Sequence, residues 1–83
     1  MEINQLKKGD IIRMSIDTQN QYRSRSEWPT TKTDEYLLVV DNNEADKYQT
    51  VAVLVLCKSS AWYMQRFYIS KQNLKYYELV EMN

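Results

Sequence analysis

The sequence predicts a mainly β protein, a small five-stranded antiparallel barrel with one short helical turn near the C-terminus. Two unbroken apolar runs, residues 36–40 and 51–56, are joined by a polar loop containing Asn42 and Asn43, which predicts a central hairpin. The other apolar segments are also short, and turn-forming residues separate them. Several short strands without a long helical pattern are typical of a small barrel.

The segments before the hairpin predict one strand and one long loop. Ile3 and Leu6 are expected to pack an N-terminal turn onto the core. Residues 7–10 contain the only glycine of the chain and predict a turn, and residues 11–16 then predict the first strand. Residues 17–34 are mostly polar, so we expect a long loop whose first half could extend the strand raggedly.

The hairpin is expected to comprise residues 35–40 and 48–56, and the segment after it is ambiguous. The aromatic content of residues 62–69 favours a strand, while a helix capped by Ser59 or Ser60 is the alternative. As a strand, the segment has one face formed by Tyr63, Phe67 and Ile69, and another formed by Trp62, Met64, Arg66 and Tyr68. Residues 70–74 predict a helical turn, and residues 76–80 predict a closing strand.

Length and composition limit the class of protein. The 83 residues predict a single domain, residues 1–83, with a modest core. Eleven basic and eleven acidic residues give zero net charge, which argues against binding to nucleic acid through bulk charge. The single cysteine, Cys57, excludes an intramolecular disulfide. No segment has the pattern of a secretion signal or a membrane span, so we expect a cytoplasmic protein.

The residue types that usually carry catalysis are scarce. The chain has no histidine, no cluster of thiolates and no glycine-rich loop for phosphates, so we predict no catalytic residue, no metal and no cofactor. Residues 41–46 offer oxygen ligands but lack the spacing of a calcium loop. We interpret them as an ordinary hairpin loop rich in Asn and Asp.

The central hairpin carries apolar side chains toward both of its faces, and one small interior can take only one set. Contiguous apolar surface left outside a core is typical of interfaces. We therefore expect a protein-binding module, with a homodimer through these strands as the simplest arrangement. The residues predicted to bind a partner combine aromatic side chains with methionine and arginine. They are Trp28, Trp62, Met64, Arg66 and Tyr68.

The distribution of charge leaves a second hypothesis open, a barrel that binds single-stranded DNA or RNA. Residues 34–46 carry five acids and no base, and residues 47–77 carry five bases and no acid, which predicts an acidic edge and a basic face unless these are ordinary surface charges. Aromatic side chains in the basic stretch could stack on bases. The residues expected to contact nucleic acid are Arg23, Arg25, Lys58 and Lys71.

Two short segments, residues 6–12 at the start and 69–74 before the last strand, resemble SH3-like barrels in their layout. The order of the segments 8–12, 38–43 and 53–60 is similar to that of PemK-type toxin endoribonucleases, which are SH3-like dimers that cleave RNA. The resemblance implies an arginine just before the strand at 36–40 and a serine or threonine after the strand at 51–56.

The chain departs from the PemK-type pattern at the arginine. Asp34 and Glu35 stand where the resemblance implies Arg-Pro, although Ser59 or Ser60 could supply the hydroxyl. A catalytic arginine would have to come from residues 23–25 of the long loop. Our main hypothesis is therefore a non-enzymatic inhibitor or regulator that binds a protein, of the kind frequent among viral proteins of phages and in mobile elements. A degenerate or active ribonuclease remains the alternative.

Overall fold

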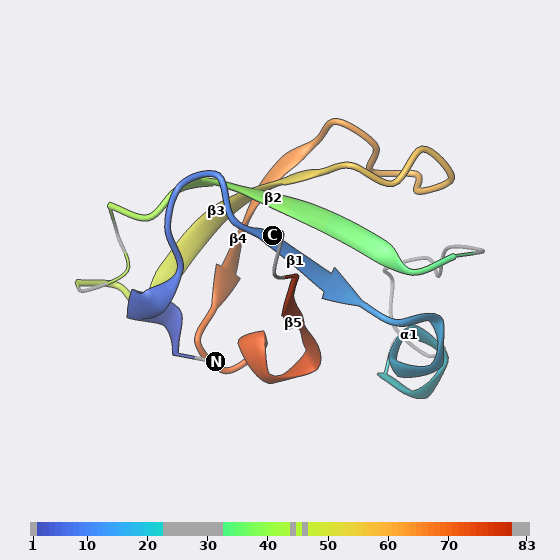
Figure 1. The fold of residues 1–83 in the computed structure, drawn as a ribbon, viewed down its shortest axis with the longest axis horizontal. Coiled ribbons are helices and arrows are strands. Elements are labelled where there is room, and N and C mark those ends of the chain that lie inside the picture. The colour runs from blue at the N-terminus through green and yellow to red at the C-terminus, as the bar shows by residue number, and fades with distance from the viewer. Residues whose placement is uncertain (1, 23–32, 44, 46, 81–83) are drawn as a thin grey trace.

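The computed structural model describes residues 2–22, 33–43, 45 and 47–80. Five antiparallel strands form one sheet in the order β4-β3-β2-β1-β5, so that β4 and β5 are its two edges (Figure 1). One short α-helix and two 3₁₀ helices accompany the sheet. In chain order the elements are η1 (Ile3–Gln5), β1 (Ile11–Met14), α1 (Ile16–Tyr22), β2 (Glu35–Asp41), β3 (Thr50–Val55), β4 (Arg66–Ser70), η2 (Leu74–Tyr76) and β5 (Glu78–Val80).

The predicted mainly β class is confirmed, and so is the central hairpin. β2 pairs with β3 in a register that places Leu37 opposite Val55 and Val39 opposite Val53, with an irregularity between Val39 and Asp41. The inward side chains of both strands are fully buried. The outward side chains of the same runs, such as Leu38 and Leu54, are half-buried.

The predicted N-terminal turns are also confirmed. Ile3 and Leu6 are buried, and Gly9 has a φ of +99°, a left-handed conformation that glycine adopts without a steric penalty. The Gly9 amide donates to the carbonyl of Val39, and the Val39 amide donates to the carbonyl of Asp10. These two hydrogen bonds fasten the segment before β1 to the adjacent strand β2.

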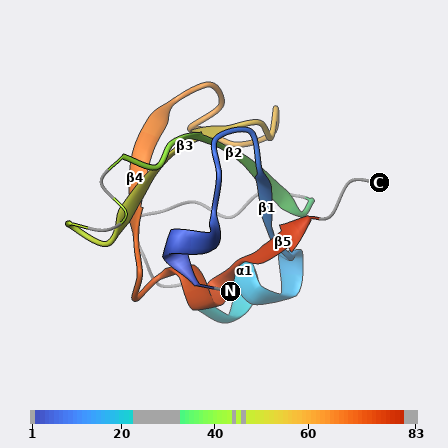
Figure 2. The same cartoon turned by 60° about the vertical axis from the view of Figure 1, so that its left-hand side comes forward.

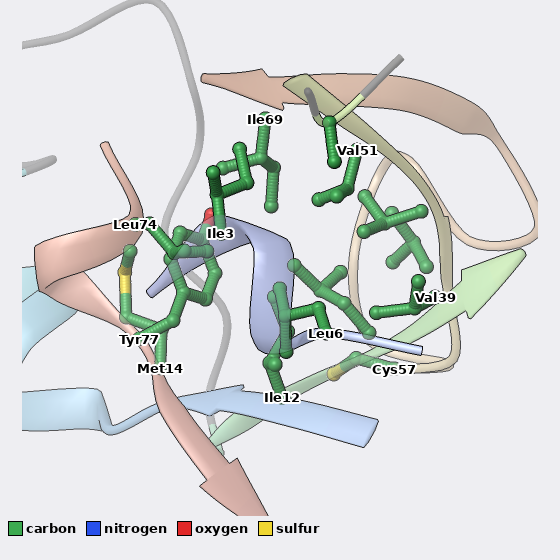
Figure 3. Packing of buried hydrophobic residues seen from close by; sticks show 14 residues of the cluster. Ile3, Leu6, Ile12, Met14, Val39, Val51, Cys57, Ile69, Leu74 and Tyr77 are labelled. Carbon is green, nitrogen blue, oxygen red and sulfur yellow. The ribbon is translucent and has the colours of Figure 1, made fainter. Parts of the chain in front are cut away.

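The core lies on the concave side of the curved sheet (Figure 2). Ile3 and Leu6 from the N-terminal segment and Leu74 and Tyr77 from the C-terminal segment pack against inward side chains such as Ile69 (Figure 3). The segment that contains η2 connects β4 to β5 and so joins the two edges of the sheet. The short helical turn predicted near the C-terminus is therefore present and closes the core.

The prediction of an irregular loop from residue 17 onward is wrong for its first part. β1 ends at Met14, and residues Ile16–Tyr22 form the helix α1, so that Ile16 does not continue the strand. The Ser15 hydroxyl accepts a hydrogen bond from the Thr18 amide, and the Asp34 carboxylate accepts one from the Ile16 amide. Because these two side chains satisfy amides at its first turn, a helix of modest propensity is stabilised here.

The prediction of one strand over residues 62–69 is partly wrong, and its helical alternative is wrong as well. β4 comprises Arg66–Ser70, and the four preceding residues form a turn. The Trp62 amide donates to the Ser60 hydroxyl, and the Gln65 amide donates to the Trp62 carbonyl. Residues 64 and 65 still bond to β3, but as a bulge: the Met64 amide donates to the Val55 carbonyl and the Val55 amide donates to the Gln65 carbonyl, so the regular pairing begins at Arg66. Tyr63, which we expected on the core face, is therefore exposed.

The closing strand is shorter than predicted. Tyr76 belongs to η2, and β5 comprises only Glu78–Val80, which pairs with β1. The predicted turn at 70–74 leads into η2. The Leu74 carbonyl accepts a hydrogen bond from the Tyr77 amide, and this bond ends the 3₁₀ helix just before β5. None of the helices in the described part of the chain is long and apolar enough to cross a membrane.

Candidate protein-binding surface

Four of the five residues predicted to bind a partner lie together along β4 and the turn before it. Trp62 is 41% exposed, Met64 55% and Tyr68 59%, and the Arg66 side chain is 54% exposed. We call these four residues the β4 surface. The fifth predicted residue, Trp28, and the predicted nucleic-acid contacts Arg23 and Arg25 lie outside the described residues.

The period of the β-strand explains why the β4 surface is exposed. Successive side chains of a strand point to opposite faces of the sheet. Ile69 is buried in the core and Phe67 packs against it, so Arg66 and Tyr68 point away from the core. The register places Arg66 opposite Leu54 and Tyr68 opposite Ala52 of β3. Tyr68 therefore stands beside a small side chain, which leaves its ring accessible.

The turn before β4 presents Trp62 and Met64 to solvent. Ser60 is buried, and its hydroxyl and carbonyl accept hydrogen bonds from the amides of Trp62 and Tyr63, respectively. Met64 has a φ of +64°, a left-handed conformation that costs a non-glycine residue roughly 1–2 kcal/mol. The positive φ belongs to a bulge, in which the Val55 carbonyl accepts the Met64 amide and the Val55 amide donates to the Gln65 carbonyl. The bulge holds the exposed Met64 beside the exposed Trp62 and Tyr63, a composition common at interfaces.

The outer face of the sheet continues the β4 surface. By the strand registers, one row of side chains crosses all five strands, beginning at Arg66 on β4. The rest of the row is apolar and half-buried. It consists of Leu54, Leu38, Ile11 and Val80. We call these four residues the apolar row. Half-burial means that the sheet's own side chains shield this face only partly.

Two ion pairs flank the apolar row. The Arg13 guanidinium donates to the Glu78 carboxylate at 2.6 Å, and Arg66 lies 3.6 Å from a carboxylate oxygen of Asp41. The hydrogen bond to Glu78 raises the pKa of Arg13, and a further one to Tyr36 adds to the shift, so Arg13 stays charged at any pH that the folded protein meets. The outer face is thus an apolar centre with a polar rim, the usual composition of an interface.

The predicted acidic edge and basic face are not assembled as single tracts by the described residues. Glu35 is fully buried rather than on the surface, Asp34 caps α1, and Asp41 lies near Arg66. Lys58 follows β3, whereas Lys71 follows β4 at the other end of the same strand pair, where its amide donates to the Gln49 carbonyl. A five-residue strand at ~3.3 Å per residue separates these two lysines, so they do not form one groove.

A second candidate site is a pocket of about 430 Å³ at the end of β3 that follows Val55. It is lined by Thr33, Asp34, Tyr36, Cys57, Lys58 and Ser59. The Cys57 sulfur lies 3.1 Å from the Ser59 hydroxyl and 3.7 Å from the Thr33 hydroxyl. Sequence reasoning missed this grouping because Thr33 and Cys57 are brought together only by the pairing of β2 with β3.

The hydroxyls and the lysine of this pocket could bind a small polar molecule, whereas an activated nucleophile would need a further group. Such a nucleophile needs a base within hydrogen-bond reach. The Asp34 carboxylate already accepts the Ile16 amide, and Ser60, the other predicted hydroxyl, accepts the Trp62 amide. Among the described residues no group of three or more Cys, Asp or Glu side chains could hold a metal ion.

Comparison of the chain with protein-family models, with curated proteins and with solved structures finds no match. The class that the fold and the candidate surface define is therefore a small, mainly β protein whose exposed aromatic residues, methionine and arginine follow one edge strand.

Proposed function

We propose that this chain is a non-enzymatic protein-binding module of SH3-like architecture, which inhibits or regulates its partner by occupying that partner's surface. The SH3-like assignment is supported by the strand order, in which β5 returns to pair with β1 after a 3₁₀ turn. The single observation that carries the function is the β4 surface. It combines exposed Trp62 and Met64 of the turn with Arg66 and Tyr68 of β4, and the register places Arg66 at the end of the apolar row.

Physical chemistry supports a binding role for this combination of side chains. Trp, Tyr, Met and Arg are enriched at protein interfaces, and Trp, Tyr and Arg dominate their binding energy. The four side chains lie on two consecutive segments, one turn and one strand, so a partner could contact all of them without a rearrangement of the fold. The zero net charge suits a partner recognised by apolar contact better than one recognised by long-range attraction.

A matched pair of tyrosine variants tests the proposal. Tyr68 is 59% exposed on β4, and Tyr48 is 61% exposed in the loop between β2 and β3. Purified tagged protein with Tyr68→Ser should lose a specific partner that the wild-type protein captures from cells of the source organism. The control variant with Tyr48→Ser should retain it, although the two tyrosines are exposed to nearly the same extent.

The binding of each captured protein must then be reproduced with purified components. An aromatic anchor of an interface contributes about 2 kcal/mol or more, so Tyr68→Ser should weaken the measured affinity at least about thirtyfold. Equal affinities for wild type and both variants would refute the β4 surface as the binding site. A Trp62→Ser variant provides a second, independent position on the same surface.

A further inference from the structure

The free edge of β4 carries backbone groups that point away from the sheet. The Lys71 amide donates to the Gln49 carbonyl, and the Val55 amide donates to the Gln65 carbonyl. In an antiparallel ladder such hydrogen-bonded pairs alternate with non-bonded pairs. The bonds from β4 to β3 are therefore made at Phe67 and Ile69, and the amides and carbonyls of Arg66 and Tyr68 point toward the free edge.

Natural edge strands are kept apart by proline, lysine, bulges or very short length. β4 itself has five residues without proline or lysine, and its register with β3 is regular. The bulge at Met64 and Gln65 and the lysine at position 71 lie just outside these five residues, so the outward groups of Arg66 and Tyr68 between them stay open to pairing. The opposite edge, β5, has only three residues. The one charge on β4, at Arg66, is partly balanced by Asp41 at 3.6 Å.

From these features we infer that the β4 edge binds a second copy of this chain, with the two β4 strands antiparallel about a two-fold axis at Phe67. The inference rests on the proposed protein-binding role of the β4 surface and names one partner for it. Arg66 of each copy then stands opposite Tyr68 of the other. Each such pair exchanges both backbone hydrogen bonds, which satisfies the outward groups of both residues.

The side chains of β4 are complementary to themselves in this register. The Arg66 guanidinium lies beside the Tyr68 ring of the second copy, an arrangement in which a cation is attracted to an aromatic face. The two Phe67 residues stand opposite each other at the axis as a non-hydrogen-bonded pair, with each side chain on the core face of its own sheet. The two pairs of Arg66 with Tyr68 beside the axis are therefore the ones that favour this register.

Other registers are less favourable. An axis at Arg66 would place the two guanidinium groups directly opposite each other, which is destabilising. An axis at Tyr68 would pair Arg66 with Ser70, whose carbonyl already accepts the Asn73 amide as the chain turns away from the sheet. The register centred on Phe67 is the one that uses the two fully outward residues and opposes no like charges.

Exchange of charges tests both the association and its register, with sedimentation equilibrium of the full chain as the measurement. Tyr68→Lys places an ammonium opposite Arg66 of the other copy at two symmetric positions, and we expect the dimer dissociation constant to rise about tenfold. The double variant Arg66→Glu, Tyr68→Lys pairs opposite charges and should return it to within about threefold of wild type. Failure of the double variant to recover dimerisation would overturn the Phe67-centred register.

A backbone variant tests the strand pairing itself. Tyr68→Pro removes an amide that points to the free edge and makes no bond to β3, so it should abolish the dimer while circular dichroism stays that of the wild type. Tyr48→Ser should leave the dimer constant unchanged. If Tyr68→Pro proves unfolded, the charge-exchange variants decide the question.

The failure of this inference can be distinguished from failure of the proposed function. A wild-type chain that is monomeric up to about 1 mM overturns the pairing with a second copy. If such a monomer still binds another protein in a manner that depends on Tyr68, the binding role of the β4 surface stands and its occupant is that protein. A dimer that Tyr68→Pro does not weaken would likewise overturn the edge pairing.

Discussion

Leu37 and Leu38 are adjacent in β2 and point to opposite faces of the sheet. The stability lost when each is replaced by alanine therefore shows how differently the two faces are covered. Leu37 is fully buried in the core, whereas Leu38 belongs to the half-buried apolar row. Replacing a buried leucine by alanine costs about 2–5 kcal/mol, because transfer energy is lost and a cavity is left. Leu38 is already in contact with solvent, so Leu38→Ala should cost only about 1 kcal/mol.

Urea unfolding followed by far-ultraviolet circular dichroism measures both losses. A domain of this length is expected to have a free energy of unfolding of roughly 4–12 kcal/mol. With a slope of about 1 kcal/mol per molar urea, the midpoint should fall by about 3 M for Leu37→Ala and about 1 M for Leu38→Ala. If the stability lies at the low end, Leu37→Ala is unfolded without urea, which preserves the order of the two variants.

Equal losses for the two variants would refute the reasoning, because the outer face would then be as closed as the core. Protein concentration separates the two ways in which that could arise. A loss for Leu38→Ala that grows with protein concentration would mean that a second copy covers the apolar row. A loss independent of concentration would mean that the monomer itself covers the apolar row, and the case for a free outer face would fail.

Three further predictions concern the interior and the strained turn. Gln19 is buried and its amide nitrogen donates to the Thr33 carbonyl at 2.9 Å; Gln19→Leu should lower the free energy of unfolding by about 1–3 kcal/mol in urea titrations, since that carbonyl is left without this donor. Met64→Gly should raise the melting temperature, because relief of the positive φ gains up to about 1 kcal/mol after the entropy of glycine is subtracted. The buried Cys57 thiol should react with a disulfide reagent far more slowly in the native protein than in urea.

The parts of the fold that were predictable are those specified by neighbouring residues. The two apolar runs that became β2 and β3 needed no distant partner to be recognised, and neither did the glycine turn at Gly9. In β4, alternation alone assigned Ile69 to the core and Arg66 and Tyr68 to solvent. Most of the β4 surface could therefore be read from the order of its side chains.

The parts that were missed depend on contacts between residues distant in sequence. The sequence of α1 has no strong helical pattern. The Asp34 carboxylate accepts a hydrogen bond from the Ile16 amide at its first turn, although the two residues are 18 positions apart. Its one fully buried side chain, Gln19, bonds to the Thr33 carbonyl, 14 residues away. The start of β4 was misplaced for the opposite reason, since the buried Ser60 favours a local turn and a bulge at Met64 and Gln65 precedes the regular ladder.

The described elements of this short chain cover one face of the sheet more fully than the other. The 3₁₀ helices η1 and η2 contribute Ile3 and Leu74 to the core on the concave side. Both are therefore used to close the same face, and the described elements offer no second layer for the other. A chain of this size buries only ~60% of its unfolded surface.

Pairing of two β4 edges would lengthen the outer face without covering it, so the apolar row would remain available to a different protein. Edge pairing and binding through the outer face are therefore compatible. The charge exchange between Arg66 and Tyr68 reports on the edge, and the concentration dependence of Leu38→Ala reports on the outer face.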